Sequence, residues 1–138
     1  MKFSRLELRD IVRSRGAVGV MAFVVTTAQG QVVHDGTLGP SHIHTGDSIY
    51  IPESLGSRSG SNLFHSFGEF SLTASQTAEF TGESSIANVI SRVTGGDPSL
   101  INGVLRSSID GADFYFVNPA GVTFGADGSV DVLSLIHI

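Results

Sequence analysis

The sequence predicts an all-β protein of the β-solenoid type, in which short strands stack in successive turns of one coil. Gly accounts for 17 of the 138 residues and only 15% of residues are charged, a composition that suits short strands and tight turns better than a helical bundle. Three apolar segments within residues 112–132 follow one another at a spacing of about eight residues, with Gly-containing turns between them. Regular short spacing of this kind is typical of a stacked solenoid.

The best-defined turn is Asn118-Pro119-Ala120-Gly121, which separates the strand expected at 114–116 from the strand expected at 122–124. The Asn118 side chain can cap the turn, Pro119 fixes φ at the second position, and Gly121 ends the turn without steric cost. A second turn at 125–128 precedes the strand expected at 130–132.

Upstream of this region, each strand that we expect is short and lies between turn residues. The expected strands are 48–51, closed by Pro52, and then 63–72, 78–80, 86–93 and 104–109, with a Gly/Ser-rich loop at 55–62. Phe64, Phe67 and Phe70 are spaced by three, as on a helix face, but Gly68 and the β-prone neighbours favour a strand. Residues 86–93 fit either pattern, and the Thr-Gly-Gly that follows favours a strand.

The first 28 residues have the features of an export signal. Five basic residues precede the apolar run 17–25, and small residues follow it at 26–28. We expect a signal peptide over 1–28 with cleavage after Ala28, and cleavage after Gly30 as the alternative. The apolar run, about nine residues long, is too short to cross a bilayer as a helix, so a permanent membrane anchor is the weaker interpretation.

Charge and residue content argue against several classes of function. Removal of residues 1–28 leaves three of the eight basic residues and eleven of the thirteen acidic ones, so the remaining chain has a net charge of −8 and no Lys. An acidic surface without a basic cluster is unsuited to nucleic acid, and a phosphate loop ending in Lys is excluded. The chain has no Cys, no Gly-x-Ser-x-Gly elbow and only singly scattered carboxylates. We therefore expect neither an enzyme nor a bound cofactor.

Several polar residues are candidates for a site, and each also has a structural explanation. Arg92 stands among apolar residues, and we expect it to form a buried or half-buried ion pair with Asp97 or to bond a turn carbonyl. Asn88 shares a strand face with Arg92, and inward-facing Asn side chains can hydrogen-bond along a stack. His42 and His44 have a spacing compatible with a metal site, but no third ligand is evident and a solvated loop is preferred.

Residues 62–67 form a compact aromatic segment that supplies further structural candidates, namely Asn62, Phe64, His65 and Phe67. His65 lies amid apolar neighbours, so we expect a residue at the edge of the core with satisfied hydrogen bonds rather than a catalytic base.

Four segments, in order and with matching spacing, resemble the N-terminal domain of the filamentous haemagglutinins. They are residues 35–39, 62–67, 88–96 and 116–125. In that family the domain is the secretion domain of two-partner-secretion exoproteins, and it is associated with haemagglutination activity. The resemblance implies a right-handed parallel β-helix whose N-terminal end is capped by extra strands.

The resemblance also implies a route of export. The Sec machinery would export the chain to the periplasm, where the periplasmic domains of a partner outer-membrane β-barrel transporter would recognise it before its passage to the cell surface or medium. The resemblance further implies that Asn118, Pro119, Ala120 and Gly121 are needed for secretion, as a rigid corner or as a direct contact with the transporter. Ala120 stands where Asn is common in the family.

Residues 133–138 form a mostly apolar run without a turn or polar cap. We expect this end to be ragged and non-native, so that the secretion domain, residues 29–132, is incomplete and the chain is a fragment of a large exoprotein such as an adhesin. A host or matrix ligand would then bind through the missing C-terminal region. The alternative function is a fragment of a secreted β-helix enzyme that acts on polysaccharides, because the same fold hosts such enzymes.

Overall fold

The computed structural model describes residues 30–137, and the predicted signal peptide with its cleavage site after Ala28 lies outside the described residues. The described part consists of short strands and one turn of 3-10 helix. The elements are β1 (Gln31–His34), β2 (His42–Ile43), β3 (Ser48–Pro52), η2 (Glu53–Leu55), β4 (Ser57–Ser59), β5 (Asn62–Ser71), β6 (Thr77–Thr81), β7 (Asn88–Val93), β8 (Ser99–Ile101), β9 (Val104–Ser107), β10 (Asp113–Val117), β11 (Val122–Phe124), β12 (Ser129–Asp131) and β13 (Leu135–His137). Within residues 30–137, no helix is long and apolar enough to cross a membrane.

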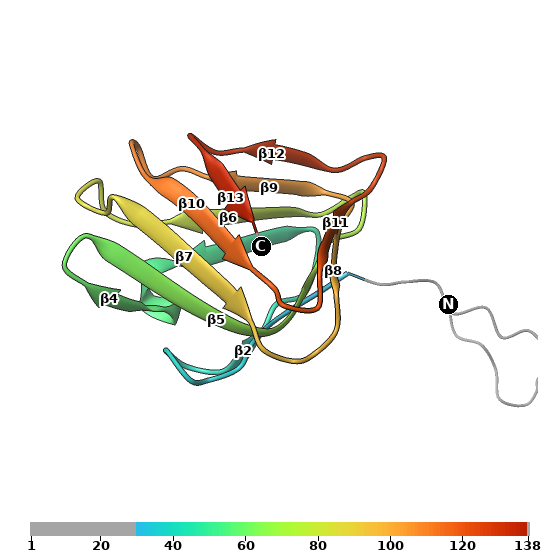
Figure 1. Cartoon of the computed structure of the whole chain (residues 1–138), viewed down its shortest axis with the longest axis horizontal. Coiled ribbons are helices and arrows are strands. Elements are labelled where there is room, and N and C mark those ends of the chain that lie inside the picture. The colour runs from blue at the N-terminus through green and yellow to red at the C-terminus, as the bar shows by residue number, and fades with distance from the viewer. Residues whose placement is uncertain (1–29, 138) are drawn as a thin grey trace, which may run out of the picture.

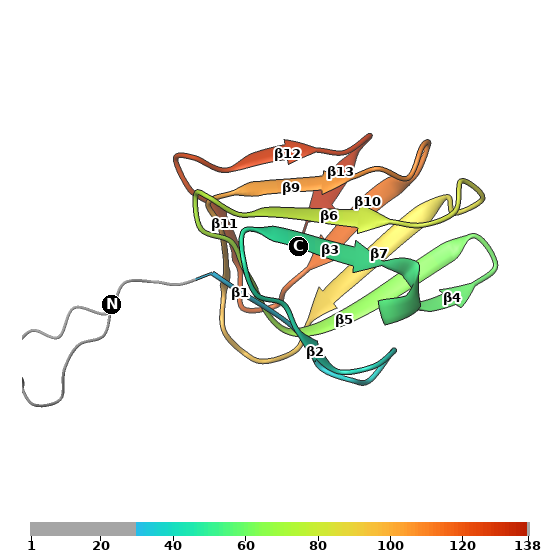
Figure 2. The ribbon, with the colours of Figure 1, turned by 180° about the vertical axis from the view of Figure 1, so that it is seen from behind.

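The strands coil into a parallel solenoid with three faces. Sheet A contains β5, β7, β10 and β13, sheet B contains β3, β6, β9 and β12, and sheet C contains β8 and β11. Figure 1 shows the strands of sheet A in front, and Figure 2 shows those of sheet B. Asn62 pairs with Asn88 and Asn88 with Asp113, so successive turns are 26 and 25 residues long. The predicted β-solenoid is confirmed, and its three faces account for the short spacing of strands in the sequence.

Antiparallel strands cover the N-terminal end of the solenoid, as expected. Strand β1 pairs with the second half of β5, and β2 pairs with β1. The loop predicted for residues 55–62 is wrong in part, because β4 pairs antiparallel with the first half of β5. Gly60 adopts a φ of 62° in the connecting turn, which Gly tolerates without strain. The Ser/Gly composition carries no strand signal, and the pairing with β5 supplies the order instead.

A β-bulge in β5 explains the three-residue spacing of its aromatic residues. His34 pairs with Phe67 and Val33 with Glu69, so the register shifts by one residue at Gly68. A bulge of this kind interrupts the alternation of side chains along a strand. Both Phe67 and Phe70 therefore face the interior, with exposures of 0% and 1%. The prediction of a strand here is confirmed.

The core lies between the three sheets and is rich in aromatic rings. The largest fully buried side chains are Phe67, Phe70, Phe80, Phe114, Phe116, Ile49, Ile51, Leu63, Leu72, Ile86, Ile101 and Leu105. Ring centroids of Phe70 lie 5.0 Å from Phe116 and those of Phe80 lie 4.8 Å from Phe114, so the rings connect one turn with another. Burial of each such side chain contributes about 1.5–3 kcal/mol. Apolar stacking thus stabilises a chain that has no disulfide to restrain it.

The last strands continue the same coil. Strands β10, β11 and β12 lie where the sequence predicts them. Strand β13 lies within the last residues of the sequence and pairs in parallel with β10 through Phe114 and Leu135. Leu135 packs against the core, whereas Leu133 and Ile136 are exposed.

Candidate functional site

The corner Asn118-Pro119-Ala120-Gly121 is a closed turn that its first residue caps from within. The Gly121 amide donates to the Asn118 carbonyl at 2.9 Å, and the Ala120 amide donates to Asn118 Oδ1 at 2.9 Å. Gly121 adopts a φ of 116°, in the region that favours Gly. The predicted roles of Asn118 and Gly121 in the turn therefore hold in the structure.

Asn118 also ties this corner to the preceding turn of the solenoid. Its Nδ2 donates to the Asp97 carbonyl at 3.0 Å and to Ser99 Oγ at 2.9 Å. Asn118 and Ser99 are each only 1% exposed, so the amide group satisfies polar atoms that would otherwise be buried without partners. Pro119 and Ala120, in contrast, are exposed. Another protein could therefore contact these two residues, whereas the buried side chain of Asn118 is inaccessible.

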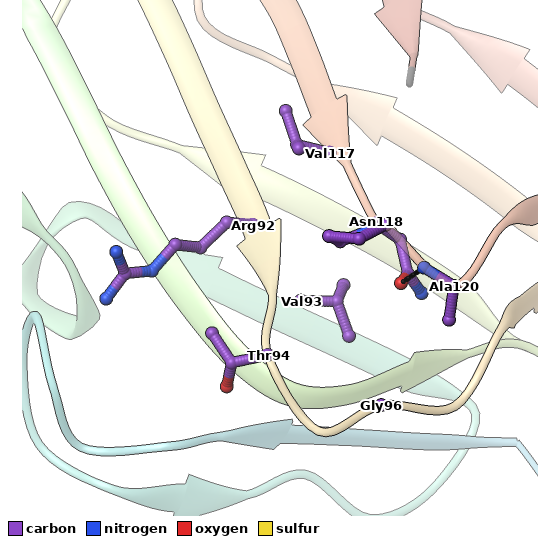
Figure 3. Close-up of a pocket in the computed structure, with 8 residues that line it drawn as sticks. Arg92, Val93, Thr94, Gly96, Val117, Asn118 and Ala120 are labelled. Carbon is purple, nitrogen blue, oxygen red and sulfur yellow. Dashed lines mark hydrogen bonds between the residues drawn. The ribbon is translucent and has the colours of Figure 1, made fainter.

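An open hollow of about 330 Å³ lies beside the corner, between β7 and β10. It is lined by Arg92, Val93, Thr94, Gly96, Val117, Asn118, Pro119 and Ala120. Figure 3 shows the Arg92 side chain directed away from the corner and across β5. The structure thus places the predicted corner and the predicted Arg92 at one site.

Arg92 is part of a hydrogen-bond network that differs from the expected ion pair. The side chain is exposed, and its guanidinium donates to Ser66 Oγ at 2.9 Å and to Thr37 Oγ1 at 3.0 Å rather than pairing with Asp97. Each of these hydroxyls donates in turn to Asp35, at 2.7 Å. Arg92 lies on the exposed outer face of β7 and bonds hydroxyls across β5, so the expected buried or half-buried ion pair with Asp97 is wrong.

Asp35 is the centre of this network. Its carboxylate accepts further hydrogen bonds from the Thr37 amide at 2.9 Å and from Thr94 Oγ1 at 2.7 Å. Burial, the largest single influence, would raise the pKa of Asp35, but the hydrogen bonds from Ser66, Thr37 and Thr94 outweigh it and hold the pKa well below its usual value. The ionised carboxylate therefore fastens the N-terminal cap to β5 and to the end of β7.

The sequence did not identify Asp35, Thr37, Ser66 and Thr94 as members of a site. Asp35 and Thr37 were recognisable only as turn residues around Gly36, and 57 residues separate Asp35 from Arg92. The local signal available was the Asx-type turn, in which Asp35 accepts from the Thr37 amide.

Asn62 and Asn88 form the expected contact along the stack, but on the other side of the sheet. Asn88 Nδ2 donates to Asn62 Oδ1 at 2.8 Å, across the register pair that joins β5 and β7. Val89, Ser91 and Val93 are the buried residues of β7, so Asn88 shares the outer face with Arg92. The shared face is confirmed, and the inward orientation is wrong.

Four histidines gather at the N-terminal cap, away from the corner. His34 lies between His44 and His65, with ring centroids 5.2 and 5.6 Å away, and the His42 ring lies 4.5 Å from that of His44. No group of three or more His, Cys, Asp or Glu within residues 30–137 is arranged to hold a metal ion. His42 is exposed and His44 is half-buried. Both rings belong to this cluster, and the solvated loop expected for them is wrong.

His65 is a core residue rather than one at its edge. His34 and His65 are 2% and 1% exposed, and none of their ring nitrogens has a hydrogen-bond partner among the described residues. Burial, followed by the neighbouring His34 and His44 rings, lowers the pKa of His65 to about 3. Burial, followed by His44 and His42, lowers the pKa of His34 to about 4. Both rings are therefore neutral at pH 7, and the expectation of satisfied hydrogen bonds for His65 is wrong.

A second open hollow, of about 300 Å³, adjoins the first on the outer face of sheet A. Its lining consists of Asn62, Asn88, Ile90, Tyr115 and Val117. Val117 lines both hollows, so the two lie next to each other between the asparagine pair and the corner.

Comparison with known proteins relates this chain to a family of secretion domains. The family model described as TPS secretion domain matches residues 25–136, which are 112 of the 138 residues. The match includes the cap, the polar network, the corner and all described solenoid strands except the last residue of β13. No curated protein and no solved structure is significantly similar to the chain.

Proposed function

The chain belongs to the TPS secretion domain family, and from this premise we propose that it is the N-terminal secretion domain of a large exoprotein that a partner outer-membrane transporter recognises and exports. As a member of this family it is a secretion domain of a two-partner secretion system, which delivers proteins to the cell surface or the extracellular space. The family consists of secretion domains and is not a family of enzymes.

The observation that carries the proposal is the extent of the match, which spans both the antiparallel cap and the solenoid turns. A structure that must fold after passing through a pore benefits from turns that stack one on another, since each new turn forms on the edge of the last. The absence of Cys from the sequence is compatible with such passage. We further propose that residues 1–28 direct the chain to the Sec machinery and are removed after Ala28, and that the exported protein acts as an adhesin.

Expression of the tagged chain with and without its transporter tests the proposal. Any outer-membrane barrel protein encoded next to the gene of this chain is tested as the transporter, and the readout is the tagged chain in the medium and on the cell surface. We expect the chain to reach the outside only when the transporter is present. Release that is equally efficient without the transporter would contradict the proposal.

A variant of the corner tests whether secretion in the presence of the transporter depends on Asn118. Asn118→Ala removes three hydrogen bonds from the corner, and we expect it to reduce secretion. The matched control is Asn102→Ala, because Asn102 also caps a turn, by accepting from the Asp127 amide, but lies outside the hollow beside the corner. Equal secretion of wild type and Asn118→Ala would show that the corner is dispensable.

A further inference from the structure

A row of apolar side chains crosses the outer face of sheet A. Phe64 pairs with Ile90, Ile90 with Tyr115, and Tyr115 with Ile136, so one residue of β5, β7, β10 and β13 stands in line. We call these four residues the apolar ladder. The first three are half-buried and Ile136 is 45% exposed. They span three strand spacings, or about 14 Å.

The equivalent row of the opposite sheet has a different character. On sheet B, Tyr50 pairs with Glu79, Glu79 with Arg106, and Arg106 with Asp131. Three of these four residues are charged, and charged side chains are mostly exposed to water. Since both rows occupy the middle of a sheet in the same solenoid, the coil itself does not demand an apolar outer face.

Charge makes the ladder a distinct part of the surface. Residues 29–138 carry eleven carboxylates and three arginines. Two of the arginines pair with carboxylates of their own chain, Arg58 with Glu53 and Glu83, and Arg106 with Asp131. Arg92, which lies beside the ladder, bonds the hydroxyls of Ser66 and Thr37 instead. A carboxylate from another molecule would find here an exposed guanidinium that forms no direct ion pair with an acidic side chain of residues 30–137.

We propose that the apolar ladder and Arg92 form the surface on which the periplasmic domains of the transporter dock. This inference rests on the proposed function and adds to it the location of the contact and the chemistry of the partner. The partner presents an apolar stripe at least about 14 Å long, which fills the second hollow between Asn88 and Val117, together with an acidic side chain that reaches Arg92. The exposed Pro119 and Ala120 border the neighbouring first hollow.

Binding of the purified chain to the purified periplasmic domains of the transporter tests this surface. The double variant Ile90→Thr/Tyr115→Thr replaces apolar groups by a residue that favours strands, and we expect it to weaken binding by about tenfold or more. The matched control Tyr50→Thr alters an aromatic residue that is 62% exposed on sheet B, and we expect binding to be unchanged. Ile136→Thr, on the exposed edge strand, tests the ladder without disturbing the core.

Urea unfolding of each variant separates loss of contact from loss of fold. A double variant with a wild-type unfolding midpoint and binding within about twofold of wild type would overturn the inference. If the double variant unfolds at a lower urea concentration than wild type, the test uses Ile136→Thr instead. Unchanged binding of Ile136→Thr to the periplasmic domains would equally overturn the inference. Self-association of the wild-type chain that the ladder variants abolish would assign the face to a second copy and also refute the proposal.

The salt dependence of binding tests the role of Arg92. Binding of wild type should weaken as salt is added, because an ion pair at the surface is screened, and Arg92→Gln should show a smaller dependence than the control Arg106→Gln. Equal salt dependence of the two variants would contradict an ion pair at Arg92. If the wild-type chain itself does not bind the periplasmic domains, the proposed function fails; if wild type binds and the ladder variants bind equally, only this inference fails.

Discussion

Replacement of Asn118 by Ala tests whether the corner acts through stability. The side chain makes three hydrogen bonds, two as donor and one as acceptor, and its removal leaves the buried Ser99 hydroxyl without that donor. At about 1 kcal/mol for each hydrogen bond, and more for a buried group left unpaired, we expect a loss of about 2–4 kcal/mol. A domain of this size has a total stability of about 5–15 kcal/mol, so the variant should fold but unfold more easily.

Urea denaturation followed by circular dichroism measures this loss. With a denaturant dependence of about 1–2 kcal/mol per molar urea, the midpoint should fall by about 1–4 M. Pro119→Ala is the control, since Pro119 is exposed and its loss should cost only about 0.4–1 kcal/mol through the entropy of the unfolded chain. A loss below about 0.5 kcal/mol for Asn118→Ala, within the range of ordinary surface substitutions, would refute the reasoning. Failed secretion of a stable Pro119→Ala chain would instead indicate direct contact with the transporter.

Three further predictions concern the cap and the packing of the coil. First, His34 and His65 should make the fold sensitive to acid, because their pKa values of about 4 and 3 lie below the ordinary 6.5. As pH falls below 6.5 the unfolded chain takes up protons before the folded chain does, so the free energy of unfolding falls by up to about 1.4 kcal/mol per pH unit for each ring. His65→Phe should flatten the dependence of the unfolding midpoint on pH, and an unchanged slope would contradict this. Second, Asp35→Asn should lower the free energy of unfolding by about 1–3 kcal/mol at pH 7. Because the pKa of Asp35 is depressed in the folded chain, the difference in unfolding free energy between wild type and variant should shrink as pH falls below 3.8. A difference that stays constant with pH would show that the charge is irrelevant. Third, a Cβ at Gly95 would lie 2.1 Å from the carbonyl oxygen of Gly68, so Gly95→Ala should lower stability by about 1–3 kcal/mol, and a variant as stable as wild type in urea would show that the two turns separate without cost.

Much of the coil was predictable because its signals are local. The corner at Asn118 depends on the conformations that Asn, Pro and Gly prefer, and these act within four residues. The alternation in residues 112–132 likewise depends on neighbours in the chain. Such signals specify where strands begin and end, and repeated at regular spacing they indicate a solenoid.

Other features could not be predicted, because their cause lies in a distant part of the chain. Strand β4 has no strand signal of its own and is ordered by pairing with β5. Phe67 and Phe70 both enter the core because the pairing with β1 includes a bulge. The sequence related His42 only to His44, and the folding of β1, β2 and β5 against one another brings these two rings together with those of His34 and His65.

The sequence by itself determined the fold class, the corner and the family resemblance, since all three rest on short segments whose order and spacing can be compared directly. The tertiary structure decided what each polar side chain does. It buried Asn118 and exposed Pro119 and Ala120, and it joined Arg92 to Asp35 through two hydroxyls. It also aligned Phe64, Ile90, Tyr115 and Ile136 on one face. Residues about 25 apart become neighbours only when the turns stack, and the register of that stacking depends on the whole sheet.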